Sequence, residues 1–85
     1  MDSRLDDPCI LFALRRESAP FCRRYRPRLP FTGAPCWARF CDGPQRVLVA
    51  ETGVGQANVA RVLDWLLAKP LFGGVPYEPK LIVFA

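Results

Sequence analysis

The sequence has no histidine, and its four cysteines include no Cys-x-x-Cys pair. Cys36 and Cys41 alone cannot make a closed zinc site, which takes four ligands. We therefore expect no bound metal and no cofactor, with a zinc site kept as the minor alternative. The cysteines are interpreted as reduced residues that mostly fill the core of a cytoplasmic protein.

Long apolar segments are also lacking. No run approaches the roughly 20 residues that a membrane-spanning helix needs, so we expect no membrane partner. The amino terminus carries Asp2, Asp6 and Asp7 where a secretory signal would be basic, and Ile10 to Leu14 is too short for its apolar core. No internal repeat or low-complexity tract is visible. These absences indicate a cytoplasmic chain.

The chain has 85 residues, which is short for an architecture built from strands and helices. Residues 1–8 are polar and predict a flexible tail. Residues 80–85 form an apolar strand pattern that stops without a turn or cap. We therefore expect residues 9–85 to be the amino-terminal part of a larger domain that is truncated at residue 85.

The expected fold class is α/β, with elements in the order β-α-β-β-α-β. Apolar runs, proline positions and one amphipathic period predict these elements. They are a strand over residues 9–14, a short helix over 19–25 capped by Ser18, a loop or extended connector over 26–35, a hairpin over 37–50, a helix from 56 to 69 and a strand over 81–84. If the first strand runs parallel to the strand before the long helix, their carboxyl ends meet at one rim.

A glycine-bearing turn, Thr52-Gly53-Val54-Gly55, joins the hairpin to the long helix. It does not match the dinucleotide fingerprint, because Asn58 stands where a third glycine is required, and no Gly-Lys-Ser/Thr follows to make a P-loop. Taken alone, such a turn is more often a structural connection than a ligand site. Its combination with the end of the first strand makes a ligand site the favoured interpretation.

The first strand ends Ala13-Leu14-x-x-Glu17, and the strand before the long helix ends in the glycine turn. With the amphipathic helix and the final Pro-x-Leu-Ile-Val-Phe-Ala segment, this order resembles the amino-terminal part of the nucleoside phosphorylase and nucleosidase family. The resemblance spans residues 10–85 and is greatest to the methylthioadenosine/S-adenosylhomocysteine nucleosidases. It implies a mixed-sheet, three-layer phosphorylase/hydrolase-like fold and cleavage of the N-glycosidic bond of a purine nucleoside.

The resemblance also implies roles for individual residues. Glu17 matches a catalytic glutamate that positions the water nucleophile, whereas the phosphate-using branch has an arginine there. Arg15 or Arg16 could instead bind phosphate, so phosphate remains an alternative acceptor. The resemblance assigns substrate binding to five residues, which are Ala13, Thr52, Gly53, Val54 and Gly55. From the sequence alone, Glu17 is equally well explained as a surface residue at a helix amino terminus.

The family's proton donor to the base matches no position of this chain. We therefore expect the 85 residues alone to be inactive and the full-length protein to form a homo-oligomer. One alternative is a small basic module that binds phosphate-rich partners through the arginines between Arg15 and Arg28. No aromatic interleaving accompanies them, so a solvated loop is favoured and a nucleic-acid partner is not expected. An inactive truncated product is the third alternative.

Overall fold

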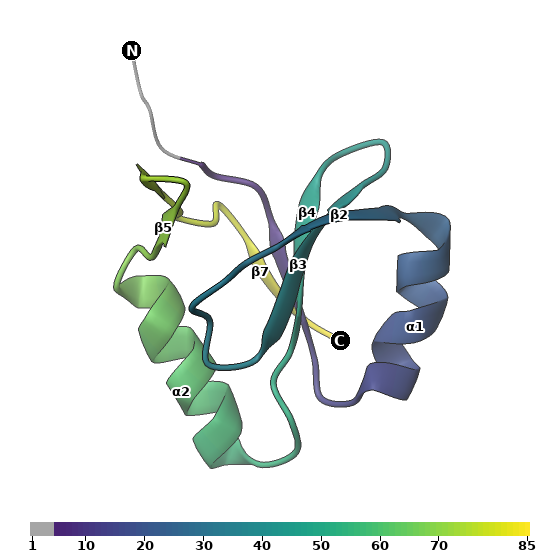
Figure 1. The fold of residues 1–85 in the computed structure, drawn as a ribbon. Coiled ribbons are helices and arrows are strands. Elements are labelled where there is room, and N and C mark those ends of the chain that lie inside the picture. Colours follow the sequence, from purple (N-terminus) through teal and green to yellow (C-terminus); the bar gives the residue numbers. More distant parts are fainter. Residues whose placement is uncertain (1–4) are drawn as a thin grey trace.

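The computed structural model describes residues 5–85, except for the side chains of residues 15 and 26–29 (Figure 1). Five strands form a mixed sheet in the order β2-β3-β4-β1-β7, and β5 and β6 form a separate hairpin. The elements are β1 (Cys9–Phe12), α1 (Arg15–Arg24), β2 (Arg26–Pro30), β3 (Trp37–Asp42), β4 (Val47–Glu51), α2 (Gln56–Leu67), β5 (Leu71–Phe72), β6 (Val75–Pro76) and β7 (Ile82–Phe84). No helix among the described residues is both long and apolar enough to cross a bilayer.

The centre of the sheet is parallel. β1 pairs in parallel with β4 and with β7, while β3 pairs antiparallel to β4. The carboxyl ends of β1, β4 and β7 therefore lie at one edge, which is the lower edge in Figure 1. The α/β class and the expected meeting of the first strand with the strand before the long helix are confirmed.

The two helices cover opposite faces of the sheet, so the chain has three layers (Figure 1). Successive residues of β4 alternate between these faces. Leu48 and Ala50 belong to the core beneath α2, together with its buried residues Val62 and Leu66. Val47 and Val49 belong to the core beneath α1. Burial on both faces explains why β4 is an unbroken apolar run.

An aromatic cluster closes the α2 side of the core. The ring centroid of Phe31 lies 4.8 Å from that of Trp65 and 5.1 Å from that of Phe72. Phe40 and Tyr77 pack edge-on at 5.7 Å. Trp65 is half-buried and packs against this cluster as a peripheral core residue.

The helix α1 begins at Arg15, four residues before the expected start, so the prediction that Ser18 caps it is wrong. Glu17 takes the capping role, since its Oε1 accepts a hydrogen bond of 2.9 Å from the backbone N–H of Leu14. Ser18 is instead buried inside the helix. Pro20 lies within the helix and does not end it.

The proline-rich segment expected as a connector includes β2, which pairs antiparallel with β3. Pro27 lies opposite Cys41 and Pro30 opposite Arg39, with a register shift between them. A strand can hold two prolines here because β2 is at the edge of the sheet, where missing N–H donors break no central ladder.

Residues 5–8, which were expected within a flexible tail, are held by the carboxyl-terminal part of the chain. The Leu5 N–H donates to Pro76 O and the Glu78 N–H donates to Leu5 O, both at 2.8 Å. The Tyr77 hydroxyl donates to Asp7 O at 2.7 Å. Residues 1–4, the rest of that expected tail, lie outside the described residues.

Two neighbouring leucines of α2 test how this helix docks. Leu66 is 2% exposed and Leu67 is 75% exposed, although the amphipathic period of this helix predicts that both face the core. Leu66→Ala should lower the free energy of unfolding by about 2–5 kcal/mol, because it leaves a cavity. Leu67→Ala should change it by less than about 0.5 kcal/mol. Urea denaturation followed by circular dichroism measures both, and equal losses would contradict the packing of α2.

Alkaline pH should destabilise the fold. Burial raises the pKa of Cys9 from 9.0 to about 12 and that of Cys41 to about 11, and it also raises the pKa of Tyr77. Unfolded cysteines ionise near a pKa of about 8.5, so the stability present below that pH is lost progressively as pH rises through the folded values. The urea midpoint should fall above about pH 9. In Cys41→Ala the midpoint should fall less steeply with pH. An identical pH dependence in the variant would show that ionisation of Cys41 does not contribute to the alkaline loss of stability.

Candidate functional site

The loops that follow β1 and β4 lie side by side at the carboxyl edge of the sheet. Phe12 is paired with Glu51, and the Thr52 N–H donates to Phe12 O at 2.8 Å, one residue beyond the end of β4. Ligands of open α/β sheets bind outside the carboxyl ends of the strands. The structure has two hollows in this region, one on the α2 side and one on the α1 side.

The first hollow, here the glycine-turn hollow, has a volume of about 500 Å³. It is lined by Ala13, Gly53, Val54, Gly55, Gln56, Val59, Ala60 and Leu63. The structure therefore brings together four residues of the expected substrate-binding set, which are Ala13, Gly53, Val54 and Gly55. Its volume lies within the range of small-molecule sites, about 300–1,000 Å³. Its lining is mostly apolar and offers surface for rings and carbon chains.

The turn beneath this hollow depends on glycine. Gly53 and Gly55 have φ values of +83° and +109°, a region that side chains rarely adopt. Asn58 Nδ2 donates to Val54 O at 2.7 Å, which ties the first turn of α2 back to the loop. A Cβ added at Gly53 would lie 3.1 Å from Asn58 Nδ2. The turn is therefore held in one shape by Asn58.

Thr52, also expected to bind substrate, is buried and does not line the glycine-turn hollow. Its Oγ1 donates to Gly53 O at 2.8 Å, so the hydroxyl stabilises the turn. Its backbone N–H is used in pairing with Phe12. In this structure Thr52 supports the hollow from below.

Glu17, the expected catalytic residue, is not among the residues that line the glycine-turn hollow. Its side chain is exposed at the start of α1, where its carboxylate accepts from the Leu14 N–H. Arg16 is also exposed and lines neither hollow. The side chain of Arg15, the other expected phosphate ligand, lies outside the described residues. The structure thus places Glu17 as a helix-capping residue.

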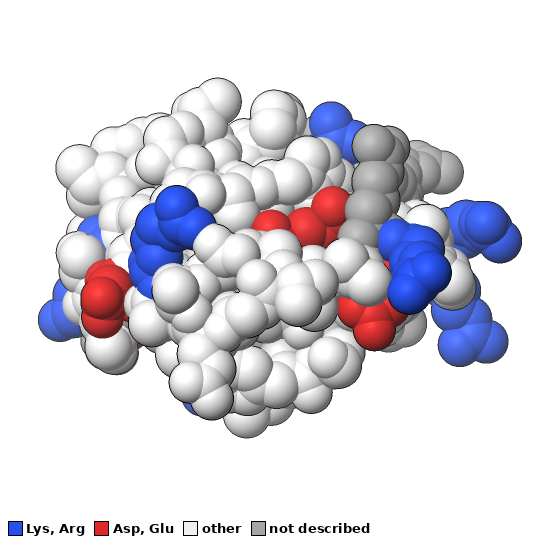
Figure 2. Space-filling model, turned by 90° about the horizontal axis from the view of Figure 1, so that it is seen from below, with Lys and Arg blue, Asp and Glu red and all other residues white. Residues whose placement is uncertain are grey.

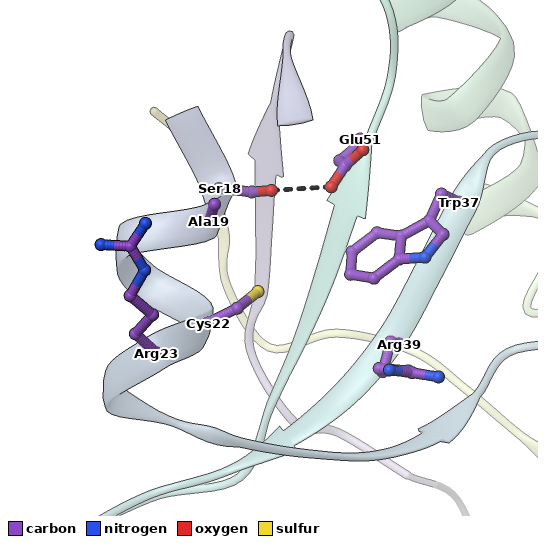
Figure 3. A pocket seen from close by; sticks show the side chains of 7 residues that line it. All are labelled: Ser18, Ala19, Cys22, Arg23, Trp37, Arg39 and Glu51. Atoms are coloured by element: carbon purple, nitrogen blue, oxygen red, sulfur yellow. Dashed lines mark hydrogen bonds between the residues drawn. The ribbon is translucent and has the colours of Figure 1, made fainter. Parts of the chain in front are cut away.

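The second hollow, here the Glu51 hollow, lies between α1 and the strands β3 and β4 (Figure 3). Its volume is about 250 Å³, and it is lined by Ser18, Ala19, Cys22, Arg23, Trp37, Arg39 and Glu51. The buried Ser18 hydroxyl donates to Glu51 Oε2 at 2.7 Å. Burial raises the pKa of the Cys22 thiol, which keeps it protonated at neutral pH.

Little in the sequence indicates this second hollow. Trp37 and Arg39 alternate along β3 with Ala38 and Phe40, so the side chains that face α1 include an indole and a guanidinium. From the sequence alone, that alternation predicts only a strand. Glu51 was missed because its partner, Ser18, belongs to a helix 33 residues earlier in the chain.

The charges of the carboxyl edge are dispersed. Figure 2 looks onto this edge and shows mostly uncharged surface, with acidic groups near the middle and further acidic groups beside basic ones towards the sides. Arg16, Arg23 and Arg24 are exposed along α1, while the side chains of the other arginines of that segment lie outside the described residues. Among the described residues, no three His, Cys, Asp or Glu side chains are grouped closely enough to hold a metal ion.

Two glycines with similar backbone angles test the constraint on the turn. Gly53→Ala should destabilise the fold by more than about 1–2 kcal/mol, because the new Cβ meets Asn58 as well as an unfavourable φ. Gly33 has a φ of +87° with nothing near its Cβ position, so Gly33→Ala should show the backbone cost alone. Thermal denaturation compares them. Equal losses would show that Asn58 does not restrict the turn.

Comparisons with protein-family models, with curated proteins and with solved structures found no match. The resemblance expected from Ala13, Glu17 and the glycine turn therefore stays a prediction. Any function assigned to this chain rests on its residues and on the geometry of the two hollows.

Proposed function

We propose that this chain binds a purine nucleoside in the glycine-turn hollow and takes part in cleaving its N-glycosidic bond, with water or phosphate as the acceptor. The observation that carries the proposal is that Ala13, Gly53, Val54 and Gly55 line one hollow at the ends of neighbouring parallel strands. A base and a ribose present apolar faces of the kind that this lining can cover. The proposed fold is the amino-terminal part of a phosphorylase/hydrolase-like domain.

The chemistry of this reaction divides the site in two. Cleavage passes through an oxocarbenium-like sugar, which needs a nucleophile on one side and protonation of the departing base on the other. In the proposal, Glu17 serves the nucleophile side by releasing the Leu14 N–H when substrate binds and orienting water instead. Arg16 is the phosphate ligand if the acceptor is phosphate.

The residues that line the glycine-turn hollow carry no ionisable side chain, so none of them can protonate the departing nucleobase. The proposal therefore limits this chain to sugar binding and nucleophile positioning. It follows that the 85 residues bind nucleoside without turnover. Full-length protein, assembled as a homo-oligomer, would supply the proton donor.

Two exposed apolar residues give a matched test of nucleoside binding. Val54 is 67% exposed in the hollow, and Leu71 is 63% exposed on β5 and lines none of its walls. Val54→Asp should weaken binding of 5′-methylthioadenosine about tenfold or more, because it places a charge on an apolar lining, whereas Leu71→Asp should not. A titration of the ¹⁵N-labelled chain followed by NMR measures both. Absence of binding, or equal binding by the two variants, would overturn the proposed site.

The reaction itself is tested with the full-length gene product. Release of adenine from 5′-methylthioadenosine should be observed, and running the assay with and without phosphate identifies the acceptor. Glu17→Gln retains an acceptor for the Leu14 N–H, so its fold should persist while hydrolysis falls. Unchanged hydrolysis in this variant would remove Glu17 from the mechanism while leaving the binding site intact.

A further inference from the structure

The Glu51 hollow contains two opposite charges that do not pair. Trp37 lies opposite Glu51 and Arg39 opposite Val49 in the β3–β4 ladder, so Arg39 and Glu51 are diagonal neighbours on the face covered by α1. Diagonal positions are about 7–8 Å apart, which long side chains can bridge. Among the described residues no ion pair joins Arg39 to Glu51, and Glu51 Oε2 accepts from Ser18 instead.

Within the described part of the chain, the Arg39 side chain has a hydrogen-bond donor without an acceptor. Its Nε is buried and has no hydrogen-bond acceptor among the described residues. The guanidinium carbon lies 5.9 Å from the centroid of the Trp37 ring, a cation–π contact that supplies no oxygen acceptor for Nε. A buried donor without an acceptor is costly. The Nη groups of the same guanidinium can donate to an anionic group in the hollow.

The remaining walls limit what can fit. A volume of about 250 Å³ is below the range of drug-sized ligands and suits a molecule of a few heavy atoms. In Figure 3 the Trp37 ring faces the space beside Ser18 and Cys22, whereas the Arg23 side chain extends along the outer side of α1. Trp37 is 40% exposed, so its ring forms an apolar wall that is open to solvent.

These features favour a ligand with both charges. A simple anion would be attracted by Arg39 but repelled by the Glu51 carboxylate. A simple cation would be attracted by Glu51 but repelled by the Arg39 guanidinium. We propose that the Glu51 hollow binds a free amino acid. Its carboxylate accepts from the Arg39 guanidinium, its ammonium donates to Glu51, and an apolar side chain packs on Trp37. This hollow lies on the face opposite the glycine-turn hollow, so the proposal is independent of nucleoside binding.

Three probes of the same carbon skeleton test the charge requirement. L-leucine carries both groups, 4-methylpentanoate lacks the ammonium, and 3-methylbutylamine lacks the carboxylate. L-leucine should shift the NMR signals of the Trp37 indole and the Arg39 Nε–H saturably, with a Kd on the order of 1 mM, as expected for so small a ligand. Each single-charge probe should bind at least about tenfold more weakly. The Trp65 indole, which packs on the α2 side, is the internal control and should not move.

Variants identify the groups responsible. Arg39→Gln and Glu51→Gln should each weaken L-leucine binding about tenfold or more, and Glu51→Gln keeps an acceptor for the Ser18 hydroxyl. Arg24→Gln is the matched control, because this exposed arginine of α1 does not line the Glu51 hollow, and it should bind as the wild type does. The proposal is overturned if a single-charge probe binds as tightly as L-leucine, if Arg39→Gln binds normally, or if about 20 mM L-leucine leaves Trp37 unmoved. The probe comparison uses the unmodified chain, so it decides the matter even if a variant does not fold.

Discussion

The parallel pairing of β4 with β1 is the constraint on which the rest of this structure depends. The Leu48 N–H donates to Pro8 O and the Thr52 N–H donates to Phe12 O, both at 2.8 Å, so backbone bonds fix the register at the two ends of β4. Since β4 is buried on both faces, a helix must cover each face. Both helices start at the carboxyl edge, directly after the loops that follow β1 and β4. The positions of both hollows follow from this arrangement.

The alternation of side chains along β4 gives the two hollows different chemistry. Val47, Val49 and Glu51 face α1, whereas Leu48 and Ala50 face α2. The carboxylate at the end of the strand therefore enters the α1 side, where it meets Ser18 and lies near Arg39. The α2 side receives the glycine turn and the apolar start of the helix. The apolar hollow, where we propose that a nucleoside binds, and the charged hollow, where we propose that an amino acid binds, thus lie on opposite faces of one sheet.

Periodicity and apolar runs were sufficient to predict the α/β class, the β3–β4 hairpin, the long helix and the common edge of β1 and β4. They failed where a long-range partner decides the local structure. Residues 5–8 contain two aspartates and a proline, yet hydrogen bonds with Pro76 and Tyr77 hold them in place. Residues 26–30 are proline-rich, yet their position at the edge of the sheet lets them pair as a strand. Of the residues expected to bind substrate, Ala13 and the two glycines line one hollow, because the backbone topology places them at one edge of the sheet. Glu17 and Ser18 were harder to place, since their roles depend on where α1 begins and on a partner, Glu51, in another element.

The central claim is that a nucleoside occupies the apolar hollow above the glycine turn. Intermolecular nuclear Overhauser effects between adenosine and the methyl groups of the ¹³C-labelled chain measure this contact directly. The base and ribose protons should give effects to Val54, Val59 and Leu63, which line that hollow. Effects to Val47 and Val49 beneath α1, or none at saturating adenosine, would contradict the account.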